Sequence, residues 1–68
     1  MSGEELKRRR EALDMTVGEL AREFEVIPSS VYRWESGVVE LKGLTAVGAD
    51  TILKRLESQK RKEAASAG

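Results

Sequence analysis

Apolar residues recur at the spacing of an α-helix in four stretches of this chain. These stretches are residues 2–13, residues 16–24, residues 28–36 and a last one from about Thr45 to Glu57 or beyond. They predict an all-α fold, a small domain of four helices or at most five. The apolar faces of these helices predict a core of Leu6, Leu13, Leu20, Ala21, Phe24, Val26, Val31, Trp34, Leu44, Ile52 and Leu56.

Local signals mark where the second and third helices begin and end. Thr16 and Glu19 are three residues apart, as in a capping box, where the two residues satisfy each other's free amides. The apolar pattern breaks at residues 25–27, and Pro28 suits the first turn of a new helix because the N–H that it lacks would be unpaired there. Gly37 then ends this helix. Residues 16–37 therefore predict two short helices joined by a very short turn.

The third helix has a small polar outer face. At about 100° per residue, the side opposite its apolar stripe carries Ser29, Arg33 and Ser36, with Tyr32 at the flank. Small polar side chains around one arginine can enter the major groove of DNA. An ordinary solvated face on a helical hairpin is the alternative interpretation, and the helical wheel alone does not separate the two.

The order and spacing of several residues resemble one protein family. Leu20-Ala21, Val26, Val31 and the run Trp34-Glu35-Ser36-Gly37 are typical of the Cro/repressor-type (Xre) helix-turn-helix family, closely over residues 6–37 and loosely over 38–56. The resemblance implies a lambda-repressor-like DNA-binding domain over residues 1–57, with the helix-turn-helix unit at 16–37. Residues 58–68 would then form a basic, partly disordered tail.

The resemblance also implies two sets of DNA contacts. Base edges are expected to be read by Ser29, Tyr32 and Arg33, and the sugar-phosphate backbone to be held by Arg8, Arg9, Thr16, Pro28, Ser36, Lys42 and Gly43. For Arg8 and Arg9, plain solvation is as good an interpretation as a phosphate contact. For Arg33, an internal pair with an acid such as Glu40 is the alternative.

Arg10 is expected to have a structural role. It lies on the apolar stripe between Leu6 and Leu13, where an unpaired charge would be very costly. Glu35, on the inner side of the third helix, is its expected partner. The resemblance implies the same ion pair, because many members of the family carry arginine and glutamate at these two positions.

Three residues depart from the family pattern. Glu25 stands where glycine is usual, at a left-handed turn, so that either a side chain there costs roughly 1–2 kcal/mol or the turn changes shape. Val17 stands where glutamine is common, and Ile27 where serine or threonine caps the recognition helix. Pro28 and Ser29 are expected to share the capping role of Ile27.

The loop and the tail leave several interpretations open. Leu41 is expected to pack under the domain, whereas Val38 and Val39 either pack or serve an interface, with packing favoured. The basic triplet at residues 60–62 extends the last helix, binds phosphate or is solvated, and solvation is the default. The final five residues are expected to be disordered.

Charge and composition exclude several functions. Twelve basic residues balance twelve acidic ones, with net +2 over residues 1–10 (4 − 2), −5 over 11–50 (3 − 8) and +3 over 51–68 (5 − 2). DNA binding would therefore depend on local positive patches. Without cysteine or histidine, disulfides, the usual zinc sites and histidine acid–base chemistry are excluded, so we expect no enzyme, no metal and no cofactor.

The expected partner is double-stranded DNA. A palindromic operator bound by a homodimer is the usual solution for so small a module, and a repressor is the expected role. The charged start of the chain and the lack of a membrane-length apolar run predict a cytoplasmic protein, nucleoid-associated when bound to DNA. The alternative is a protein-interaction module, such as an antitoxin-like partner with weak DNA affinity.

Overall fold

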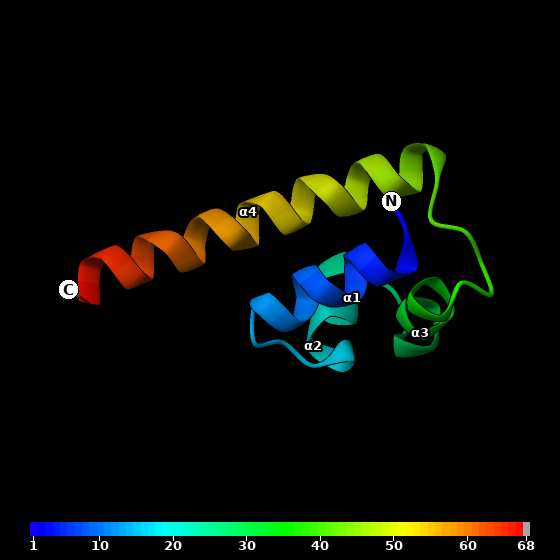
Figure 1. The fold of residues 1–68 in the computed structure, drawn as a ribbon, viewed down its shortest axis with the longest axis horizontal. Helices are drawn as coiled ribbons and strands as arrows, with labels where there is room; N and C mark the ends of the chain where they lie inside the picture. Colours follow the sequence, from blue (N-terminus) through cyan, green and yellow to red (C-terminus); the bar gives the residue numbers. More distant parts are fainter. Residues whose placement is uncertain (68) are drawn as a thin grey trace.

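Four helices make up the computed structural model, which describes the backbone of residues 1–67 and the side chains of residues 1–65. They are α1 (Gly3–Ala12), α2 (Val17–Phe24), α3 (Pro28–Ser36) and α4 (Gly43–Ala67), and no strand occurs among the described residues. The predicted all-α, four-helix fold is confirmed. α3 packs on α1 and α2, and the long α4 lies across them with its C-terminal half projecting beyond the body (Figure 1).

Side-chain caps set the starts of the first two helices. Thr16 and Glu19 form both bonds of the predicted capping box, since the Glu19 amide donates to Thr16 Oγ1 at 3.1 Å and the Thr16 amide donates to Glu19 Oε1 at 2.8 Å. At α1 only one such bond forms, from the Glu5 amide to Ser2 Oγ at 3.0 Å. Gly3 then lets α1 approach α3, because a Cβ there would collide with backbone oxygens of α3.

The turn between α2 and α3 takes the left-handed conformation expected from the family pattern. Glu25 has φ 57° and ψ 42°, and its amide donates to carbonyls of the last turn of α2. The Val26 amide also donates to Ala21 O, at 2.9 Å, so this carbonyl accepts from both residues of the turn. The turn therefore keeps the left-handed shape at Glu25, and the strain of a side chain in that conformation stays a prediction.

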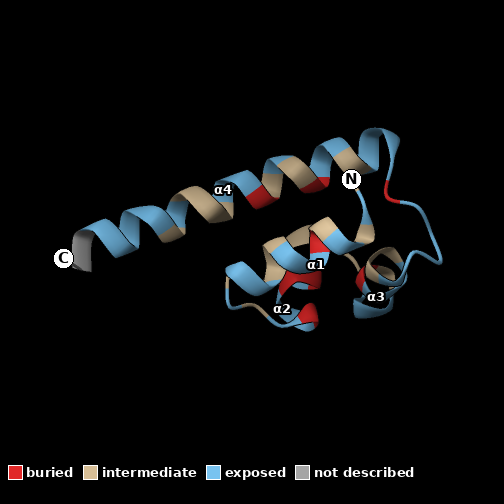
Figure 2. Ribbon diagram, in the orientation of Figure 1, coloured by how far each residue is buried: buried red, intermediate tan, exposed pale blue. Residues whose placement is uncertain are grey.

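The core lies where the inner faces of the four helices meet (Figure 2). Its buried members are Leu6, Val17, Leu20, Ala21, Val31, Leu41, Ala49 and Leu53, and five other predicted members, Leu13, Phe24, Val26, Trp34 and Leu56, are half-buried against them. Ile52 is also half-buried, at the edge of an apolar groove. Leu41 packs under the domain as expected.

The prediction that Leu44 belongs to the core is wrong, because 90% of its surface is exposed. At about 100° per residue, the nine steps from Leu44 to the buried Leu53 (53 − 44) amount to two and a half turns. Leu44 therefore points away from the side of α4 that packs on the domain. Val38 is 76% exposed and Val39 44%, so packing is the wrong interpretation of this pair.

α4 begins earlier and ends later than its apolar stripe suggested. It starts at Gly43 and continues through residues 58–67, so the basic triplet extends the helix. The expected disorder of the last five residues is wrong for 64–67, and Gly68 lies outside the described residues. Lysine, arginine, glutamate, glutamine and alanine favour helix strongly, which explains a helix without an apolar stripe. None of the four helices has the length and apolarity that a membrane span requires.

Candidate nucleic-acid interface

The outer face of α3 is open to solvent. Ser29, Tyr32, Arg33 and Ser36 are all exposed, and Tyr32 keeps 62% of its surface accessible. Ser36 Oγ donates to Arg33 O at 3.1 Å, so this hydroxyl is held against the backbone. Within the described side chains Arg33 makes no ion pair, because Glu40 pairs with Lys42 instead. The predicted base-reading side chains are thus brought together on one exposed surface.

The start of α3 has no side-chain cap. Ile27 occupies the N-cap position with 64% of its surface exposed, and Ser29 makes no capping bond in its place. Pro28 follows at the first helical position, and the Ser30 amide donates to Ile27 O at 3.0 Å. The expectation that Pro28 and Ser29 share the capping role is therefore wrong as far as Ser29 is concerned.

Two of the other expected backbone contacts lie at the start of α4. Gly43 has φ 65°, a left-handed conformation that glycine adopts freely, and it leads directly into the helix. Lys42 is 77% exposed, and its 3.7 Å pair with the equally exposed Glu40 is of a kind that contributes little. Lys42 is therefore available to a phosphate beside the positive end of a helix dipole.

Arg10 and Glu35 form the predicted ion pair. Arg10 Nε and Nη2 donate to the two carboxylate oxygens of Glu35 at 2.8 and 3.1 Å, and Nη1 donates to Met15 O at 2.9 Å. Only 13% of the Arg10 side chain and 8% of the Glu35 side chain are exposed. Hydrogen bonding to Glu35 raises the pKa of Arg10, despite the opposing effect of burial. This pair joins α1 to α3 and keeps both charges inside the domain.

Arg9 is paired with two carboxylates of α4, and only 17% of its side chain is exposed. Its Nε and Nη2 donate to the two oxygens of Glu57 at 2.8 and 2.9 Å, and its Nη1 donates to Asp50 Oδ1 at 2.8 Å. These hydrogen bonds lower the pKa of both carboxyl groups. The structure therefore separates the two expected arginines: Arg9 joins α1 to α4, whereas Arg8 is exposed and, among the described side chains, unpaired.

Lys7 is a basic residue beside α3 that the sequence did not single out. It lines a shallow hollow together with Arg10, Tyr32, Glu35 and Ser36. The signal was present in the spacing, because Lys7 precedes Arg10 by three residues and therefore lies on nearly the same side of α1. Arg10 was already expected to face α3.

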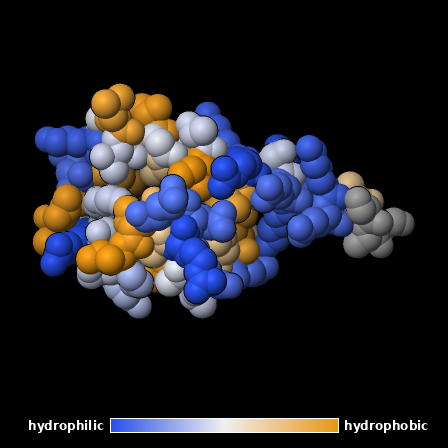
Figure 3. Space-filling model, turned by 180° about the vertical axis from the view of Figure 1, so that it is seen from behind, coloured by the Kyte–Doolittle hydropathy of each residue, from blue (hydrophilic) through white to orange (hydrophobic). Residues whose placement is uncertain are grey.

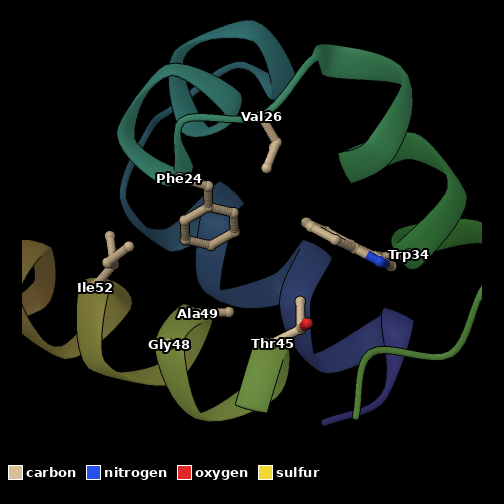
Figure 4. A pocket seen from close by; sticks show the side chains of 7 residues that line it. All are labelled: Phe24, Val26, Trp34, Thr45, Gly48, Ala49 and Ile52. Carbon is tan, nitrogen blue, oxygen red and sulfur yellow. The ribbon is translucent and has the colours of Figure 1, made fainter. Parts of the chain in front are cut away.

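An apolar groove opens between α4 and the helix-turn-helix unit (Figure 4). Its walls are Phe24, Val26, Trp34, Thr45, Gly48, Ala49 and Ile52, and the volume is about 200 Å³. The rings of Phe24 and Trp34 lie 6.3 Å apart at an angle of 58°, a favourable tilted contact. The Thr45 hydroxyl and the indole N–H of Trp34 are the polar side-chain groups of this wall, so the groove offers packing surface rather than reactive chemistry.

Comparison with known proteins gives one match. A family model described as helix-turn-helix matches residues 6–54, which is most of the chain and includes α2, the turn and α3. No curated protein matches the sequence. No solved structure matches it either.

Proposed function

Because the chain belongs to the Cro/repressor-type helix-turn-helix family, we propose that it is a transcriptional regulator that binds double-stranded DNA sequence-specifically. The observation that carries the proposal is Arg33, which is exposed on the outer face of α3, makes no ion pair with any described side chain and lies within the matched region. In the major groove, an arginine can donate to O6 and N7 of one guanine. Ser29 and the ring of Tyr32 contact neighbouring base edges.

The backbone contacts surround this helix. We assign them to Arg8, Thr16, Pro28, Ser36, Lys42 and Gly43, and we assign Arg9 to the interior of the domain because of its bonds to α4. Phosphate contacts of this kind fix the register of a protein on DNA and carry no sequence information themselves. The regulator would act in the cytoplasm, at the nucleoid.

A homodimer on a palindromic operator, acting as a repressor, is the finer form of the proposal. Large apolar side chains remain exposed along the start of α4 and the loop before it, where apolar surface gathers in Figure 3. Leu44 and Val47, at 90% and 63% exposure, are the strongest examples. Contiguous exposed apolar surface marks protein interaction sites, and a second copy would cover it.

The same apolar surface favours a second candidate function. An antitoxin-like interaction module would use Leu44 and Val47 to bind a different protein and would have weak affinity for DNA. Its acidic centre, with net −5 over residues 11–50, would repel phosphate. A gel-shift series with mixed genomic DNA at several salt concentrations separates the two, since this module would give no salt-dependent shift.

The test of the proposed function compares two single variants on a selected DNA site and a scrambled one. Arg33→Ala should lose about 1–3 kcal/mol on the selected site only, whereas Lys42→Ala should weaken binding to both DNAs and reduce the salt slope by about one. Lys54→Ala is the matched control, because Lys54 pairs with Asp50 on α4. Equal losses on both DNAs for Arg33→Ala would contradict base reading by Arg33.

A further inference from the structure

The basic run of α1 divides into residues with different surroundings. Arg9 is bonded to α4 and Arg10 to α3, so the positive charges of both are already matched by carboxylates. Lys7 is exposed and makes no ion pair with any described side chain. It is therefore the cation of α1 that lies beside α3 without a protein partner.

The hollow around Lys7 has the groups that an anion needs. Lys7 and Arg10 contribute two positive charges and Glu35 one negative charge, so the hollow keeps a net +1 (2 − 1). Glu35 already accepts two bonds from Arg10, which reduces its repulsion of a second anion. Tyr32 is exposed on the same wall, with a hydroxyl that can donate.

We propose that Lys7 and the Tyr32 hydroxyl together bind one phosphate of the DNA strand that borders the groove occupied by α3. The inference rests on the proposed DNA-binding function and adds a contact that family resemblance did not supply. The lysine ammonium gives a charge-assisted bond to a phosphate oxygen, and the phenol gives a second donor. The Ser36 hydroxyl also lines this hollow, where it donates to Arg33 O at 3.1 Å.

Tyr32 gives this contact a structural consequence. It precedes Arg33 directly, so a phosphate held by Tyr32 and Lys7 would fix how far the recognition helix turns in the groove. This contact would therefore position Arg33 without reading a base itself. Loss of the contact should lower the affinity for all DNA sequences alike.

The test uses the full chain and two DNA duplexes, the selected site and its scrambled counterpart. Lys7→Ala should weaken binding to both about fivefold at 0.15 M salt and lower the salt slope by about 0.9. Lys7→Arg should keep the wild-type slope, and Tyr32→Phe should show a smaller loss without a change in slope. Lys54→Ala is again the matched control, and melting temperatures establish that each variant is folded.

A second arm locates the phosphate. A neutral methylphosphonate replaces one phosphate of the duplex at a time. At one position this replacement should weaken DNA binding by the wild type but leave DNA binding by Lys7→Ala unchanged. If Lys7→Ala matches Lys54→Ala in slope and affinity while Arg33→Ala still loses specificity, the inference is overturned and the proposed function stands. If the wild type shows no salt-dependent binding to any duplex, both are overturned.

Discussion

Glu25 shows at the scale of one residue how this chain departs from its family without changing the fold. Its φ of 57° is in the left-handed region, where a side chain usually costs about 1–2 kcal/mol. Glu25 keeps this conformation because its amide is bonded to carbonyls at the end of α2 and because Val26, the next residue, packs against the core. The turn therefore keeps its geometry and stores strain.

Replacing Glu25 by glycine should release this strain. We expect Glu25→Gly to stabilise the domain by about 1 kcal/mol, because glycine adopts positive φ freely. The urea midpoint measures the gain, and Arg22→Gly, inside α2, should be destabilised instead. A less stable Glu25→Gly variant would show that the added freedom of the unfolded chain outweighs the strain. The DNA preference should not change.

The Arg10–Glu35 pair is the second feature whose energetics depend on single residues. Arg10→Met leaves a buried carboxylate without a partner, so we expect a loss of about 3–5 kcal/mol in unfolding free energy. Glu35→Leu should cost a similar amount, whereas the double variant should cost much less than the sum. A double-mutant cycle by urea unfolding measures this coupling, and additive losses would contradict the pairing.

At the scale of elements, α4 is held to the rest of the domain by charged side chains as well as by apolar packing. The buried Ala49 and Leu53 anchor its first half. Further along, Arg9 binds Glu57, and Lys60 Nζ donates to Ala12 O and to Asp14 Oδ2, each at 2.7 Å. Lys60 thereby satisfies a carbonyl at the end of α1.

These contacts predict a pH dependence. The bonds from Arg9 lower the pKa of Glu57 and Asp50, so their stabilising effect is present above the unfolded values near pH 4 and is lost as the pH falls through the lower folded values. Arg9→Met should therefore be less stable at pH 7, and its stability should fall less between pH 5 and pH 2. Urea midpoints across this range measure the difference. Arg8→Met, at an exposed neighbouring residue, is the control, and its urea midpoint should depend on pH as that of the wild type does. If the midpoint of Arg9→Met shows the same pH dependence as the wild type, Arg9 is not coupled to the two carboxyl groups.

Much of the fold could be predicted from the sequence because its signals are local. Capping residues, the short turn at Glu25 and the inner stripe of α3 each depend on neighbours within one turn. The Arg10–Glu35 pair could be predicted because a charge on an apolar stripe requires a partner. The role of Arg9 could not, since it depends on how α4 crosses α1, and no local pattern encodes that crossing.

At the scale of the whole molecule, exposed apolar surface at the start of α4 predicts self-association. Leu44→Lys should convert a homodimer into a monomer, as measured by sedimentation with and without DNA. The lack of native cysteine allows a second measurement. Gly48→Cys, at an open position beside this surface, should form an interchain disulfide on oxidation, whereas Lys62→Cys should not. A wild type that is monomeric both free and on DNA would contradict the dimer.

The projecting half of α4 has a mechanical consequence. Past Lys60, no hydrogen bond or ion pair joins a described side chain of α4 to the rest of the domain, yet the helix continues to Ala67. A second module fused to the end of such a helix would be held in a fixed orientation relative to the domain. Each helical residue inserted at the junction would rotate the fused module by about 100° around the helix axis and move it about 1.5 Å along that axis. The orientation of the attached module would therefore repeat about every 3.6 inserted residues.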